Sequence, residues 1–173
     1  GLSKLKSLII ENYNIYGGGT KVSQIGDICK ITSLTYLKLW FDNPLSNEFC
    51  NSLKYLTGLE TLSLWSLSLD YLDCLEYLPK SIHTLELKSV SDIITKVLNY
   101  LSKQTNIRCL DLEKDIEEDY HEHNEEQDFF MSLDRYIVTN KNLECITGYV
   151  DKLEMSRKRE ELLEKKVLPY ITR

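Results

Sequence analysis

The chain is poor in the residues and motifs that mark several large classes of protein. Its 173 residues include three prolines and seven glycines, too few for a disordered or collagen-like chain. No apolar run approaches the roughly 20 residues needed to cross a bilayer. No charged and then apolar leader stands at the start of the sequence. We therefore expect neither a membrane-bound protein nor a signal peptide.

Excess positive charge and paired-cysteine motifs are also missing. The formal net charge is −6, which argues against a nucleic-acid partner because such partners need a basic surface. The five cysteines are odd in number and form no Cys-x-x-Cys motif, and no Asn-x-Ser/Thr glycosylation acceptor is present. We expect reduced, mostly buried thiols in a reducing compartment, the cytoplasm or the nucleus.

The chain does contain a repeated spacing of leucine and isoleucine. Residues 59–69, LETLSLWSLSL, have leucine at the first, fourth, sixth, ninth and eleventh positions. The same spacing recurs, with successive units starting 29, 25, 23, 25 and 36 residues apart. Strand side chains alternate between two faces, so the fourth and sixth positions of each unit should face a core. The units start at Leu5, Leu34, Leu59, Ile82, Ile107 and Leu143.

This pattern resembles the leucine-rich-repeat superfamily, in its intracellular, helix-containing form. The resemblance covers nearly all of residues 2–148. It implies an α/β solenoid with a curved parallel sheet on the concave side and helices on the convex side. Known members bind proteins on the concave sheet. Residues 78–87, LPKSIHTLEL, are also similar to the repeats that follow F-box domains in some substrate receptors.

The resemblance gives a division of the chain into two parts. We expect about six solenoid repeats in residues 1–148, with an acidic insertion near 113–128, and a C-terminal capping helix in 149–173. Because the first repeat starts without a polar capping segment, we also expect further repeats or another domain before it. Apolar residues at helical spacing predict helices between the strands at 49–56, 93–101 and 129–137, and a shorter turn of helix at 69–78.

The acidic insertion raises the question of a metal site. Between Asp111 and Asp128 ten residues are acidic and one is basic. His121 and His123 lie among these carboxylates and could bind a divalent metal. A solvated loop at 117–124 would not orient such ligands, so we expect neither a metal nor a cofactor. A run of acidic residues can instead capture a basic segment of a partner protein.

Two further motifs are expected to have no catalytic role. Residues 16–21, YGGGTK, lack the spacing of a phosphate-binding loop and predict a turn. Cys109 and Cys145 are expected at equivalent outward positions on neighbouring strands. A cysteine nucleophile needs a histidine within hydrogen-bond reach, and His83 is poorly placed for that role. We therefore expect two ordinary thiols and no enzyme activity.

The outward face of the sheet holds the candidate binding site. Both tryptophans of the chain fall side by side in one outward row, and exposed aromatic residues are typical of protein interfaces. The alternative is that they cover the strand ends by packing on Phe41 or a loop. Acidic residues beside them predict a partner segment with an apolar anchor followed by basic residues. The candidate residues are Tyr36, Lys38, Trp40, Ser63, Trp65, Glu86, Lys88, Asp111 and Glu113.

The sequence thus predicts a non-catalytic module that binds a partner protein through the concave face of its sheet. The alternative is the substrate-recognition part of a larger enzyme, such as an F-box-type ubiquitin-ligase receptor with its adaptor domain upstream.

The predicted capping helix in residues 149–173 leads to a test by truncation. Ending the chain after Gly148 should uncover the apolar side chains of Leu143 and Ile146, and so lower the midpoint of thermal unfolding. The measurement compares melting curves of the full chain and the truncated chain. A truncated chain that is equally stable and monomeric would mean that these residues do not cap the domain.

Overall fold

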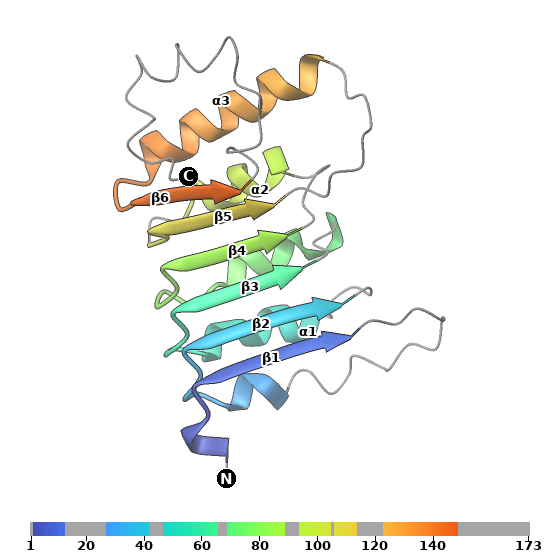
Figure 1. Ribbon diagram of the computed structural model, residues 1–173, viewed down its shortest axis with the longest axis vertical. Helices are drawn as coiled ribbons and strands as arrows, with labels where there is room; N and C mark the ends of the chain where they lie inside the picture. The colour runs from blue at the N-terminus through green and yellow to red at the C-terminus, as the bar shows by residue number, and fades with distance from the viewer. Residues whose placement is uncertain are drawn as a thin grey trace.

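A computed structural model describes residues 2–12, 27–41, 47–65, 69–88, 94–104, 106–113 and 123–148. In these residues six strands form one parallel sheet, and each strand lies beside the next in chain order (Figure 1). The mixed α/β class predicted from the sequence is therefore confirmed. The strands are β1 (Ser7–Asn12), β2 (Tyr36–Phe41), β3 (Thr61–Trp65), β4 (Thr84–Lys88), β5 (Cys109–Glu113) and β6 (Cys145–Gly148).

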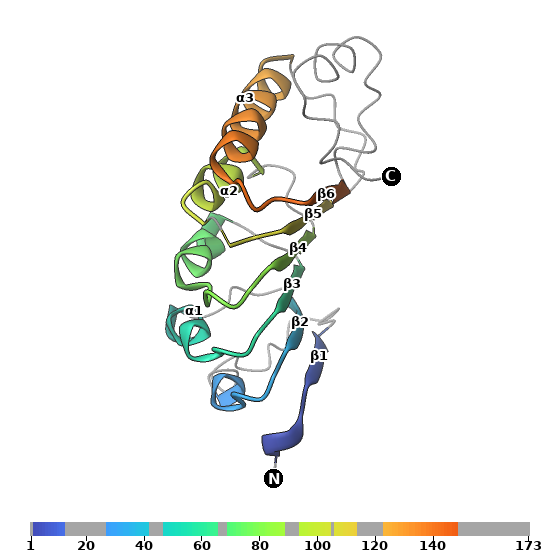
Figure 2. The ribbon, with the colours of Figure 1, turned by 90° about the vertical axis from the view of Figure 1, so that its left-hand side faces the viewer.

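The α-helices follow the strands and lie together on one side of the sheet, so that strands and helices form two layers (Figure 2). Figure 2 also shows that the strands follow a shallow arc with the helices on its outer side. We call the face of the sheet away from these helices the open face. The α-helices are α1 (Asn47–Ser52), α2 (Ile94–Leu101) and α3 (His123–Thr139), and the 3-10 helices include η1 (Leu2–Lys4), η3 (Leu53–Tyr55) and η4 (Leu69–Tyr77).

The core lies between the two layers, because each central strand turns its leucines toward the helices. On β2, β3, β4 and β5 these leucines are at most 1% exposed. Burying one leucine side chain contributes about 1.5–3 kcal/mol, so the paired leucines are a main source of stability. They are Leu37, Leu39, Leu62, Leu64, Leu85, Leu87, Leu110 and Leu112.

Every strand after β1 begins with the same arrangement of backbone hydrogen bonds. One carbonyl at the start of a unit accepts two consecutive N–H groups from the start of the next unit, at N···O distances of 2.6–3.1 Å. For example, the Lys6 carbonyl accepts from Thr35 and Tyr36. All five strand pairs therefore begin in an equivalent register. The accepting carbonyls belong to Lys6, Thr35, Glu60, His83 and Arg108.

A buried polar pair joins α3 to the strand layer. The Asn140 side-chain amide donates to the Ile107 carbonyl over 2.7 Å and to the Tyr136 hydroxyl over 3.1 Å. Tyr136 and Asn140 are both buried, and burial raises the pKa of the Tyr136 phenol. Since buried polar groups are costly unless they are paired, these bonds fix how α3 sits above β5.

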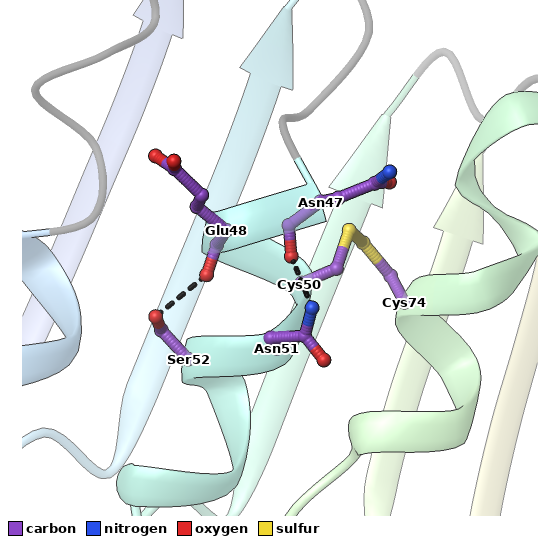
Figure 3. The surroundings of a disulfide bond; sticks show 6 residues. All are labelled: Asn47, Glu48, Cys50, Asn51, Ser52 and Cys74. Atoms are coloured by element: carbon purple, nitrogen blue, oxygen red, sulfur yellow. Dashed lines mark hydrogen bonds between the residues drawn. A yellow bond between two sulfur atoms is a disulfide. The ribbon is translucent and has the colours of Figure 1, made fainter.

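A disulfide joins Cys50 of α1 to Cys74 of η4, in the helical layers of two successive units (Figure 3). Their Cα atoms are 4.4 Å apart and both residues are buried. The prediction that all five cysteines are reduced is wrong for this pair, because strand spacing gives no information on which helical segments meet. Disulfides are typical of oxidising compartments. The predicted cytoplasmic or nuclear location stays a prediction.

Two predicted boundaries are also corrected. Helix α3 begins at His123, whereas the acidic loop was expected to reach Asn124. Charge density favours a loop, but negative charge also stabilises the first turn of a helix. Element η4 spans nine residues, whereas only a single turn of helix was expected within residues 69–78. The predicted C-terminal helix, the 16–21 turn and residues 114–122 of the insertion lie outside the described residues. Within the described segments, no helix is long and apolar enough to cross a membrane.

The disulfide should contribute measurably to stability. With Cys50 and Cys74 24 residues apart, a loop closed over that separation stabilises a fold by about 3.5 kcal/mol through the unfolded state. Reducing the native chain should therefore lower its free energy of unfolding by about that amount in urea titrations. The matched control is Cys50→Ala/Cys74→Ala, whose stability should not respond to the reductant. Equal stability of the oxidised and reduced native chains would contradict this role.

Candidate functional site

The open face carries two stacked tryptophans at the carboxyl ends of neighbouring strands. Trp40 in β2 and Trp65 in β3 are register partners, and their ring centroids are 4.3 Å apart with the planes inclined by 29°. Both residues are half-buried, so part of each side chain remains in contact with solvent. The prediction that the two tryptophans lie side by side, outside the core, is confirmed.

Lys38 orders the side chains around this aromatic pair. Its Nζ lies 4.6 Å from the ring centroid of Trp65 and 2.7 Å from Glu11 Oε1. Lys38 stands opposite Ile9 and Ser63 in the sheet, so both contacts are diagonal ones to residues two positions further along. Long side chains reach such diagonal neighbours, and a cation over an exposed aromatic ring contributes about 0.5–1 kcal/mol.

A second diagonal ion pair lies one strand beyond the tryptophans. Lys88 Nζ in β4 is 2.5 Å from Asp111 Oδ2 in β5. Lys88 is itself the register partner of Trp65. The pair therefore places a neutralised lysine and aspartate beside the aromatic stack, where each charge offsets the other.

Glu86 provides a less compensated charge on the same face. It stands between Ser63 of β3 and Asp111 of β5, and it is half-buried. Burial, and then the negative charge of Glu86, raise the pKa of Tyr36, while Lys38 lowers it. Among the ion pairs of the described residues, none includes Glu86. Its carboxylate is thus the group on this face best suited to receive a cation from outside.

Two polar atoms beneath these side chains have no hydrogen-bond partner among the residues that the structure describes. They are Ser63 Oγ and Trp65 Nε1, and both atoms are buried. Ser63 lies in its predicted row, but it is 0% exposed, so it cannot touch a partner in this conformation. Ser63 is small and lies between the longer side chains of Lys38 and Glu86. The alternation of side chains along a strand predicts which face a residue lies on, but it does not predict whether larger neighbours bury that residue. An unpaired buried polar group costs about 1–3 kcal/mol.

The structure brings the predicted residues together on four adjacent strands, β2 to β5. Glu113 joins them through the backbone register of β5, and its side chain lies outside what is described. Sequence reasoning missed Glu11 as a binding partner of Lys38. The signal was available, because Glu11 shares a row with Trp40 and has the opposite charge to Lys38. The predicted residues on these strands are Tyr36, Lys38, Trp40, Ser63, Trp65, Glu86, Lys88 and Asp111.

The remaining candidates for chemistry give no assembled site. In the described part of the chain, no group of three or more His, Cys, Asp or Glu side chains could hold a metal ion. His121, the side chain of His123 and the 16–21 segment all lie outside that part. The expected absence of a metal or cofactor therefore stays a prediction.

Comparison with known proteins identifies no relative of this chain. No protein-family model matches the chain, and no curated protein is similar enough to be matched. The function is therefore inferred from the side chains of the open face.

The stacked tryptophans can be tested in the isolated domain. Trp40→Ala and Trp65→Ala should each cost less free energy of unfolding than the about 3–5 kcal/mol of a core tryptophan, because both rings are partly exposed. In a double-mutant cycle the pair should show a coupling of about 0.5–1.5 kcal/mol, as aromatic pairs do. The measurement is urea unfolding followed by far-UV circular dichroism.

The control for this cycle is Leu64→Ala, a core change on the same strand as Trp65 that should cost about 2–5 kcal/mol. A tryptophan variant as destabilised as Leu64→Ala, or a coupling near zero, would contradict the observed stacking.

Proposed function

We propose that this chain is a non-catalytic protein–protein interaction module with a leucine-rich-repeat solenoid fold, and that it binds a partner protein through the open face. The solenoid is supported by the recurrence of one unit: the same carbonyl arrangement, the same register and the same inward leucine pair at successive strands. Units stacked in this way contact mainly their neighbours and present one long, curved surface.

The observation that carries the binding proposal is the half-buried stack of Trp40 and Trp65. A tryptophan buries about 150–250 Å² when it is covered, and tryptophan is among the residues that dominate the energy of protein interfaces. The stack is held in place by Lys38 and by the strands below it. A partner therefore meets rings whose conformational freedom is already reduced, which lowers the entropic cost of binding.

Charge on the open face selects the chemistry of the partner. Lys38 and Lys88 are engaged by Glu11 and Asp111, whereas the Glu86 carboxylate is in none of the ion pairs described. Glu86 is a diagonal neighbour of Trp65 in the sheet. Such neighbours lie about 7–8 Å apart, a distance that an extended chain covers in about two residues. The partner is thus a segment in which a large apolar residue and a lysine or arginine are two positions apart.

Selection from a displayed peptide library tests this proposal while the partner itself is still unidentified. Peptides are selected on the native chain after removal of those that bind Trp40→Ala/Trp65→Ala. The enriched peptides should combine an apolar anchor with a basic residue two positions away. Each single tryptophan variant should weaken binding by about 2 kcal/mol or more, about 30-fold in Kd. Glu86→Gln should slow association and reduce its dependence on salt.

The matched control is Tyr55→Ala. Tyr55 belongs to η3, is 59% exposed, and has a lysine ammonium 5.3 Å from its ring centroid, so it reproduces an exposed aromatic under a cation away from the open face. This variant should bind the selected peptides normally. Failure to enrich any peptide on the native chain after that removal, or enriched peptides that depend on Tyr55 instead, would contradict the proposed surface.

A further inference from the structure

Two free cysteines meet at the other end of the open face. Cys109 in β5 and Cys145 in β6 are register partners, as the sequence predicted, and both thiols are partly exposed. The third free cysteine of the described residues, Cys29, is buried, and burial raises its pKa to about 11. Only the Cys109–Cys145 pair therefore combines two neighbouring sulfurs with access to solvent in the described part of the chain.

The Cys145 thiol lies close enough to Cys109, its register partner, for the two groups to affect each other's surroundings. Burial raises the pKa of Cys145 above its ordinary value, and a hydrogen bond to Cys109 raises it further. The charges of Glu144 and Asp111 act in the same direction. A thiol that holds its proton is a weak nucleophile at neutral pH, which argues against single-cysteine catalysis.

The spacing of the strands determines what can join the two sulfurs. Side chains of register partners on adjacent parallel strands start about 4.8 Å apart. A disulfide prefers its Cβ atoms about 3.8 Å apart, so a direct bond would draw the strands together by about 1 Å. One intervening atom, with bonds to sulfur of about 2.3 Å as in zinc sites, spans the gap without moving the backbone.

The surroundings restrict the identity of that atom. Tetrahedral zinc needs further protein ligands, and the described residues hold no group of three or more possible metal-binding side chains. The acids nearest the thiols, Glu144 and Asp111, already pair with Arg108 and Lys88, so neither of these two cations is left to offset an added negative charge. The remaining fit is a thiophilic centre that takes two sulfur ligands and leaves the site neutral. A trivalent arsenical has this chemistry.

We propose that Cys109 and Cys145 form a dithiol site that binds a trivalent arsenical through both sulfurs. In the reaction two S–H bonds and two As–O bonds break, and two As–S bonds form. The thiol protons leave with the two hydroxyl groups of the hydrated arsenical as two molecules of water. No oxidation state changes and no charge is added. The site does not depend on the proposed protein-binding function.

Phenylarsine oxide is the probe for this site, used on the full chain without added reductant. Intact-mass spectrometry should show one adduct per chain, and titration should show the loss of two accessible thiols. The adduct should persist in an excess of a monothiol and disappear in a dithiol, because two sulfurs hold the arsenic. Bridging β5 and β6 should also raise the unfolding temperature, since the ligand binds the folded form.

Serine variants identify the sulfurs involved. Cys109→Ser and Cys145→Ser should each lose the monothiol-resistant adduct, with apparent affinity at least about 100-fold weaker because the second attachment is lost. Cys29→Ser should behave like the native chain. Far-UV circular dichroism establishes that each variant is folded.

Three outcomes would overturn the site: no adduct on the native chain, an adduct that survives Cys109→Ser or Cys145→Ser, or an adduct mapped to Cys29. Ready formation of a Cys109–Cys145 disulfide under mild oxidation would also contradict the spacing argument.

Discussion

The structure depends on one hydrogen-bond arrangement, in which a single carbonyl accepts two N–H groups from the start of the next unit. It recurs at each of the strand pairs and sets the first residue pair of each ladder. A shift of one residue would exchange the two faces of a strand, because successive side chains point in opposite directions. The identical start therefore keeps the leucine pairs of β2 to β5 between the layers and the residues that alternate with them on the open face.

The open face then acquires its properties from contacts across the strands. Lys38 and Lys88 each reach an acid on a neighbouring strand, two positions from their register partner. These diagonal contacts hold the charges close to the aromatic pair and leave the Glu86 carboxylate as the group most open to a partner's cation. The face is thus apolar at the tryptophans and acidic next to them. This is a combination in which the rings provide affinity, and the charge provides orientation and rate.

The sequence was sufficient for the strands, their order and the rows of outward residues, because these follow from the unit length and the alternation of side chains. It was insufficient for features that depend on three-dimensional neighbours. The Cys50–Cys74 disulfide joins helical segments whose mutual position no spacing reveals. The burial of Ser63 depends on the size of the side chains beside it, and the contact of Lys38 with Glu11 depends on its diagonal reach.

Proton–proton contacts measured by nuclear magnetic resonance test the common register most directly. The structure predicts nuclear Overhauser effects between the indole protons of Trp40 and Trp65, whose ring centroids are 4.3 Å apart. It also predicts contacts between the methyl groups of Leu39 and Leu64, which are register partners on the buried face. Strong contacts from either indole to these methyl groups, without contacts between the two indoles, would show a shifted strand and contradict the account of the open face.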